Sequence, residues 1–149
     1  MPFNFGVDQS FLLSQVGKKS IAIAFDNPLE CNIGQAPAPK ITLPFSLTKT
    51  TNLIIEVAYQ WNCNSTSRDG IYEVVMDSQV IFRHRQEPKD SSSQFGISLS
   101  DQQMPIYFPI LMNDAPAGDH EVILQWYASS RNLQACIWMA SLRVNERVM

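Results

Sequence analysis

The stretch that decides the fold is APAGDHEVILQWYASSRNLQACIWMASLRV, residues 115–144. It opens with Pro116 and Gly118, residue types that favour a turn, and then alternates in polarity up to a polar break at residues 129–132. The side chains of one parity share a face, which carries His120, Val122, Leu124, Trp126 and Ala128. Alternation with period two is typical of a strand with one buried face. The first half of the stretch therefore predicts a strand and a turn toward a second strand.

The second half of the stretch, residues 133–144, is apolar on both faces. One face carries Cys136, Trp138, Ala140, Leu142 and Val144, and the other carries Leu133, Ala135, Ile137 and Met139. An antiparallel strand normally exposes its second face to water. A second apolar face therefore predicts that another sheet, an arm or a partner subunit covers it.

Short strand patterns, separated by polar or Gly/Pro turns, recur along the rest of the chain. They lie at residues 18–25, 41–47, 52–63, 71–76, 79–86, 95–99 and 104–112. Pro44, Pro105 and Pro109 indicate edge strands, Asp77 and Ser78 indicate a two-residue hairpin, and residues 29–40 read as a connection between sheets. With the two strands above, these patterns predict an all-β fold, a two-sheet β-sandwich of jelly-roll type with about eight or nine antiparallel strands.

The chain divides into an N-terminal arm, residues 1–17, and a sandwich domain, residues 18–149. The arm carries Phe3, Phe5 and Phe11 among few charges and shows neither a helical nor a strand period. Leaving this much aromatic area in water is unfavourable by several kcal/mol. We expect the arm to lie on an apolar surface; the alternative is a poorly ordered terminus, which is common for the first residues of a chain.

Composition limits the classes of partner. The net charge is −3, and the basic residues form no cluster beyond two pairs, Lys18 with Lys19 and Arg83 with Arg85. Nucleic-acid recognition needs a basic stripe, so no nucleic-acid partner is expected. No apolar run approaches the length of a membrane span and no signal sequence opens the chain. We expect a chain that has no membrane partner and is not secreted by a signal of its own.

The three cysteines, Cys31, Cys63 and Cys136, are odd in number and widely spaced. This pattern suggests neither a disulfide framework nor a zinc site. We expect buried free thiols in a reducing compartment.

No constellation for catalysis is visible, so no enzyme, cofactor or metal is expected. His84 and His120 both lie at alternating apolar positions of expected strands, where a hydrogen-bonded core or edge histidine is the usual case. The sequence contains no nucleophile elbow, no phosphate-binding loop and no zinc-protease motif.

Sugar binding is the remaining small-ligand option, because aromatic side chains on a β-sandwich can stack on pyranose rings. Trp61, Trp126 and Trp138 fall on apolar faces and are expected in the core. Tyr72, Tyr107 and Tyr127 are the tyrosines that can present a ring outward.

The run PAGDHEVILQW, residues 116–126, followed by a polar break and a strand ending in LRV, residues 142–144, resembles the closing hairpin of jelly-roll structural proteins in tailed bacteriophages. The motif EPKD, residues 87–90, is similar to an exposed turn of the same group. The resemblance implies a trimeric virion component, either a capsid decoration (cement) protein or the distal head of a fibre. It also implies a place on the capsid exterior after synthesis in the host cytoplasm. The absence of shaft repeats before the sandwich favours decoration.

These observations lead to two functional hypotheses. The first is a non-enzymatic capsid decoration protein, a homotrimer that binds the major capsid protein and stabilises the assembled shell. Its expected self-association residues are Leu133, Ala135, Ile137, Met139, Ile123 and Tyr127, and its expected capsid-binding residues are Phe3, Phe5 and Phe11. The second is a receptor- or carbohydrate-binding head domain of a tail fibre, with a glycan partner.

Overall fold

A computed structural model describes residues 17–63, 70–86 and 102–148. The arm phenylalanines Phe3, Phe5 and Phe11, the expected strand at residues 95–99 and the motif at residues 87–90 lie outside the described residues. In the described ranges, no helix is long or apolar enough to cross a membrane.

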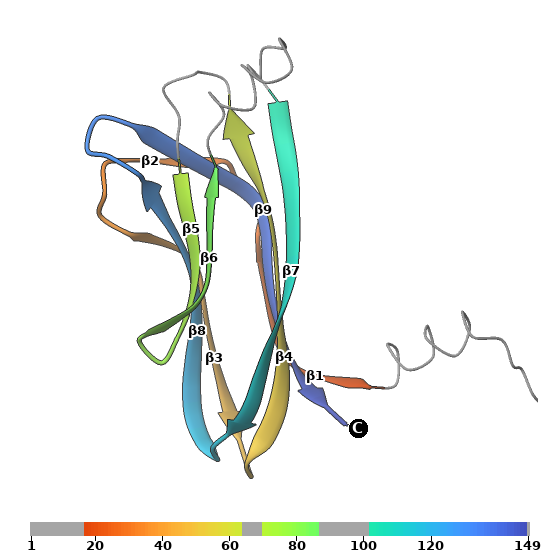
Figure 1. The fold of residues 1–149 in the computed structure, drawn as a ribbon. Coiled ribbons are helices and arrows are strands. Elements are labelled where there is room, and N and C mark those ends of the chain that lie inside the picture. The colour runs from red at the N-terminus through yellow and green to blue at the C-terminus, as the bar shows by residue number, and fades with distance from the viewer. Residues whose placement is uncertain (1–16, 64–69, 87–101, 149) are drawn as a thin grey trace, which may run out of the picture.

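The described residues form nine strands (Figure 1). They are β1 (Lys18–Asp26), β2 (Glu30–Ile33), β3 (Ala38–Leu47), β4 (Thr51–Cys63), β5 (Gly70–Met76), β6 (Gln79–Gln86), β7 (Gln102–Ala115), β8 (Gly118–Ala128) and β9 (Gln134–Arg147). One sheet has the order β1-β9-β4-β7, with β2 also paired to β9, and the other has the order β3-β8-β5-β6. Neighbouring strands are antiparallel. The two sheets face each other as a β-sandwich, which confirms the expected fold class.

The core lies between the sheets and follows the expected alternation. On β4 and β8 every second side chain is buried: Leu53, Ile55, Val57, Tyr59 and Trp61 on one strand, and His120, Val122, Leu124, Trp126 and Ala128 on the other. Each fully buried aliphatic side chain stabilises the fold by roughly 1.5–3 kcal/mol. The strands with interior prolines, β3 and β7, lie at sheet edges as predicted.

Two turns use the residues that the sequence indicated. Asp77 and Ser78 join β5 to β6 with φ angles of 48° and 72°, the left-handed backbone that two-residue hairpins need because it matches the strand twist. Gly118 begins β8 at φ 125°, a conformation that a side chain would strain.

The two apolar faces of β9 have an internal explanation, a β-bulge at Met139. Ala58 pairs with Ser141, but Gln60 pairs with Trp138, so two residues of β9, Met139 and Ala140, lie opposite one residue of β4. Met139 has φ 49°. A bulge moves the inward face by one residue. The strand therefore buries Ala135 and Ile137 before the bulge, and Ala140, Leu142 and Val144 after it.

Of the three expected covers for β9, namely another sheet, an arm or a partner subunit, the bulge shows that the other sheet of the same chain covers both sets of apolar side chains. Both sets of apolar side chains face the same core, and the change of parity lies within one strand. Trp138, which precedes the bulge, is half-buried rather than in the core.

The expectation of free thiols is wrong for two cysteines. Cys31 and Cys136 form a disulfide, because β2 pairs with β9 in a register that places them directly opposite each other. The expected irregular connection at residues 29–40 thus contains β2 and the start of β3. It is also fixed by the buried amine of Lys40, which donates to the carbonyl of Pro28 at 2.6 Å and to Glu30 at 2.5 Å.

Candidate functional site

The outer face of the five-stranded sheet carries a row of side chains across four strands. Cross-strand partners point to the same side of a sheet, so the pairings of Phe25 with Ser141, Ser141 with Ala58, and Ala58 with Tyr107 define one row. The two small side chains lie in the middle, and the two rings, both more than half exposed, lie at the ends. We call Ala58 and Ser141 the floor of this row and the rings of Phe25 and Tyr107 its two aromatic walls.

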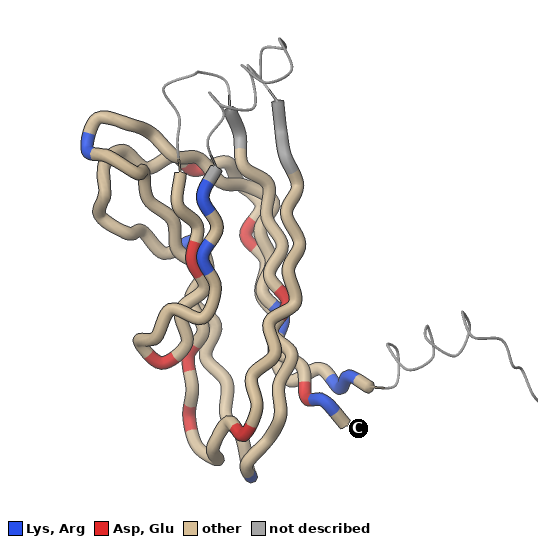
Figure 2. Tube along the Cα trace, viewed as in Figure 1, with Lys and Arg blue, Asp and Glu red and all other residues tan. Residues whose placement is uncertain are grey.

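The next row places charge beside this floor. Ile23 pairs with Arg143, Arg143 with Glu56, and Glu56 with Pro109. The guanidinium of Arg143 lies over the ring of Phe25, 5.7 Å from its centroid. Elsewhere along the described strands, charges of both signs are few and interspersed (Figure 2).

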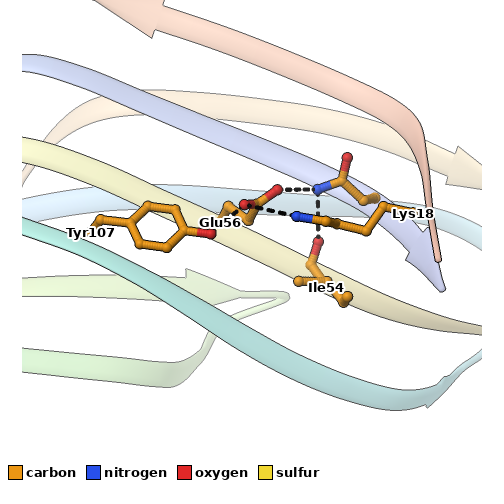
Figure 3. A network of polar contacts seen from close by, with 5 residues as sticks. Lys18, Ile54, Glu56 and Tyr107 are labelled. Atoms are coloured by element: carbon orange, nitrogen blue, oxygen red, sulfur yellow. Dashed lines mark hydrogen bonds and ion pairs between the residues drawn. The ribbon is translucent and has the colours of Figure 1, made fainter. Parts of the chain in front are cut away.

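Glu56 is the centre of a polar network on this face (Figure 3). The hydroxyl of Tyr107 donates to its Oε2, and the amine of Lys18 lies 3.5 Å from the same oxygen. The amide of Asn145 donates to Oε1 at 2.7 Å and to the carbonyl of Ile54 at 3.3 Å. Four strands thus contribute to one cluster: β1, β4, β7 and β9.

The network keeps Glu56 ionised. Burial alone raises the pKa of this carboxyl, but the hydrogen bond from Tyr107, the charge and hydrogen bond of Lys18 and the hydrogen bond from Asn145 outweigh it and hold the pKa below its ordinary value. The hydrogen bond to Glu56 in turn raises the pKa of Tyr107 to about 12. Tyr107 is therefore a neutral hydrogen-bond donor whose ring orientation is fixed by the carboxylate.

A pocket of about 350 Å³ lies over the floor, lined by Lys18, Glu56, Ala58, Tyr107, Ser141 and Arg143. A second pocket of about 420 Å³ is lined by Ala58, Tyr59, Gln60, Pro105, Ile106, Tyr107 and Met139. The two share Ala58 and Tyr107 and so adjoin. The first is the more polar, and the bulge residue Met139 forms part of the wall of the second. Strained backbone of this kind is common at functional sites.

The structure does not bring the six expected self-association residues together. Ala135 and Ile137 are buried in the core of the chain itself, so their side chains are not available to a partner. Leu133 packs against the same core. Ile123 and Tyr127 lie on the outer face of the four-stranded sheet, because they alternate with the buried residues of β8, and Met139 lies on the other outer face.

The outer face of the four-stranded sheet carries a network of its own around Glu73. Arg83 donates to its Oε2 at 2.6 Å, Tyr127 donates to the same oxygen at 3.1 Å and Gln125 donates to Oε1 at 2.9 Å. These side chains cover the carboxyl, which is buried. Neither pocket described above lies on this face.

The tyrosines expected to present a ring outward behave differently from one another. Tyr107 is exposed, as predicted. The prediction for Tyr72 is wrong. Its ring is buried and stacked on Tyr59, and its hydroxyl donates to the carbonyl of Cys136 at 2.7 Å. The two histidines are hydrogen-bonded as expected, His84 with Tyr59 and His120 with Asp77. Within the described residues, no group of three metal-ligating side chains lies together.

The sequence did not reveal the Glu56 site. Alternation on β4 places Glu56 outward, but its partners come from positions 18, 107 and 145. Only the order of strands in the sheet joins these positions, and no local pattern encodes that order.

Comparison with known proteins supports the fold. No family model matches the sequence, and no curated protein matches it either. Among solved structures, one of infectious bursal disease virus, Gx strain, matches with a TM-score of 0.54 and 10% identity, over 87% of this chain and 32% of that chain. Its jelly-roll architecture is the class to which this β-sandwich belongs.

Two other solved structures are similar at lower TM-scores. Dimeric latent PorU from Porphyromonas gingivalis matches with a TM-score of 0.46 and 14% identity, over 88% of this chain and 14% of that chain. The carbohydrate-binding module CBM36, in complex with calcium and xylotriose, matches with a TM-score of 0.41 and 9% identity, over 83% of this chain and 99% of that chain. The chain spans about a third or less of the viral and PorU chains.

Proposed function

We propose that this chain is a non-enzymatic binding module of a virion, a receptor- or carbohydrate-binding head domain whose saccharide site is the outer-face pocket beside Glu56. The likeness to a virus structure and the resemblance to phage jelly-roll proteins support the virion setting. The Cys31–Cys136 disulfide suits an exterior location, because disulfides persist on virion surfaces.

The observation that carries the proposal is the pairing of the exposed Tyr107 ring with a floor of small residues, Ala58 and Ser141. A pyranose ring has an apolar face that packs on an aromatic ring and hydroxyls that need polar partners. Ligand sites combine an apolar wall with a few placed polar groups. Here the hydrogen bond from Tyr107 to Glu56 holds the wall before any ligand arrives, which lowers the entropic cost of binding.

Titration with a panel of oligosaccharides tests this proposal. We expect saturable binding by the wild type and at least a tenfold loss in Tyr107→Ala. Tyr127→Ala is the matched control, because Tyr127 also donates to a glutamate but on the opposite outer face. Loss of binding only in Tyr107→Ala supports the site; equal binding by both variants, or no binding to any member of the panel, contradicts it.

A second candidate, a trimeric capsid decoration protein that binds the major capsid protein, is favoured by exposed apolar side chains on the same face. Ile23, Phe25 and Leu111 are 42%, 61% and 61% exposed and lie on or beside the rows described above. Monomeric proteins seldom expose large contiguous apolar patches. In this candidate the face contacts a neighbouring copy and the N-terminal phenylalanines contact the shell.

Light scattering tests the second candidate. A trimer has a mass of about 50 kDa, three times the chain mass of 16.8 kDa, and should co-sediment with expanded capsids that lack the chain. Leu111→Asp should give monomers, because the contact would bury an unpaired charge. Leu111 does not line either pocket, so this variant leaves saccharide binding unchanged. A wild-type chain that is monomeric and does not co-sediment with capsids would contradict the decoration role.

A further inference from the structure

We infer that the outer-face pocket selects a saccharide bearing a carboxylate, which Arg143 binds as a bidentate partner while the sugar ring packs on Tyr107. This inference rests on the proposed saccharide site and goes one step further, because it names the charge of the ligand. A neutral sugar would leave the site's cationic group without an anion.

The acceptor in the pocket is already occupied. Both carboxylate oxygens of Glu56 accept hydrogen bonds within the chain, Oε1 from Asn145 and Oε2 from Tyr107 and Lys18. The side chain of Glu56 is only 13% exposed. Glu56 therefore positions Tyr107 and Lys18, and it has little capacity left for the hydroxyl groups of a ligand.

The groups with unused capacity are donors. Arg143 is exposed and contacts the ring of Phe25, but it makes no ion pair or hydrogen bond within the described ranges 17–63, 70–86 and 102–148. The hydroxyl of Ser141, its neighbour on the floor, likewise has no hydrogen-bond partner in those ranges. A guanidinium offers five N–H donors and no acceptor. The complementary ligand group is therefore an acceptor.

The charge of the pocket agrees with this. Its charged groups are Lys18, Arg143 and Glu56, and the Lys18 and Glu56 charges offset each other across 3.5 Å. Arg143 remains as a net positive charge, held in place by the ring of Phe25. Arginine and carboxylate match in shape, because two parallel N–H groups face two oxygens.

The group that would stack on the sugar, Tyr107, and the group that would bind its carboxylate, Arg143, lie on opposite sides of the floor. Ala58 and Ser141 separate Tyr107 on β7 from Phe25 on β1, and Arg143 lies on the Phe25 side. A sugar ring on Tyr107 can therefore direct a carboxylate toward Arg143. The small floor side chains let the ring approach the sheet.

Calorimetric titration of the full chain with tetragalacturonate, and with the neutral galactotetraose as control, tests the inference. We expect the acidic tetrasaccharide to bind at least tenfold more tightly than the neutral one at low salt. Arg143→Gln should abolish this preference, and Arg143→Lys should restore part of it, because a lysine keeps the charge and loses the bidentate geometry. Arg131→Gln, which removes an equal charge from the exposed β8–β9 loop, should keep the preference.

The outcomes separate this inference from the proposed function. Equal binding of the acidic and neutral sugars overturns the inference and leaves the saccharide site standing. Binding of neither sugar up to millimolar concentrations overturns both. Equal loss in Arg143→Gln and Arg131→Gln attributes the preference to overall charge and also overturns the inference. Arg143 is exposed, so its variants are expected to fold, and their melting curves check this.

Discussion

His120 shows how a single polar residue is satisfied at the border of the core. Its Nδ1 lies 2.6 Å from Oδ2 of Asp77 and its Nε2 lies 2.7 Å from the carbonyl of Pro116. Both neighbours are acceptors, so this site favours the protonated ring, in which both nitrogens donate. The hydrogen bond to Asp77, together with that to Pro116, raises the pKa of His120 above its ordinary 6.5. The imidazole also stacks on Phe45.

The contacts of His120 with Asp77 and Pro116, here called the His120 clasp, predict a pH dependence of stability. The contribution of His120 is complete below pH 6.5 and is lost as the pH rises through its raised pKa. Burial raises the pKa of Asp77, but the hydrogen bonds from His120 and from the Glu121 amide outweigh it and lower the value below 3.8, so its contribution is lost only in more acidic solution. The clasp is therefore strongest between about pH 4 and 6.5.

Urea unfolding of the wild type and Asp77→Asn across pH 5–9 measures the effect. At pH 6 we expect the free energy of unfolding of the wild type to exceed that of Asp77→Asn by roughly 1 kcal/mol, a value discounted for the partial exposure of Asp77. This difference should shrink as His120 deprotonates. A difference that stays constant with pH would show that the contact between Asp77 and protonated His120 does not contribute to stability.

Met139 holds a left-handed backbone conformation without being a glycine. Such a conformation costs a side-chain-bearing residue about 1–2 kcal/mol. Met139→Gly should therefore stabilise the chain by roughly 1 kcal/mol, although the lost contacts of a side chain that is 46% exposed offset part of the gain. Thermal melting checks this, with Met139→Ala as the control that keeps a Cβ. Destabilisation by glycine would show that the side chain matters more than the backbone.

At the scale of elements, the disulfide fixes the short strand β2 to β9. Cys31 and Cys136 are 105 residues apart, and closing a loop of this size in the unfolded chain corresponds to about 4.7 kcal/mol in the chain-entropy model. We expect the double variant Cys31→Ser, Cys136→Ala to lose about 2–5 kcal/mol of unfolding free energy. Reductant should reproduce this loss in the wild type and have no effect on the double variant. An unchanged midpoint would mean that β2 contributes little.

The strands also show which features of the fold can be predicted from the sequence and which cannot. Alternation on β4 and β8, the turn at Asp77 and the edge prolines are local signals, and the strands they predicted are present. The bulge at Met139 leaves no local signal, so alternation alone assigns two apolar faces to β9 and predicts that another sheet, an arm or a partner subunit covers the second. The Cys31–Cys136 pair and the Glu56 cluster depend on which strands become neighbours. That order is set by packing of the whole chain.

At the scale of the whole molecule, the two outer faces differ. On the four-stranded sheet, Glu73 is covered by Arg83, Gln125 and Tyr127, and the polar groups satisfy one another. On the five-stranded sheet, the network around Glu56 stops short of Arg143, and large apolar side chains remain exposed beside the pockets. This asymmetry supports the proposal that a ligand binds the outer face of the five-stranded sheet.

Mapping amide chemical shifts during titration with tetragalacturonate tests this assignment most directly, because it reports the location of binding without any substitution. We expect saturable shifts confined to the outer face of the five-stranded sheet, centred on Ala58, Tyr107, Ser141 and Arg143. Shifts centred instead on Glu73 and Tyr127, or spectra unchanged at millimolar ligand, would contradict it.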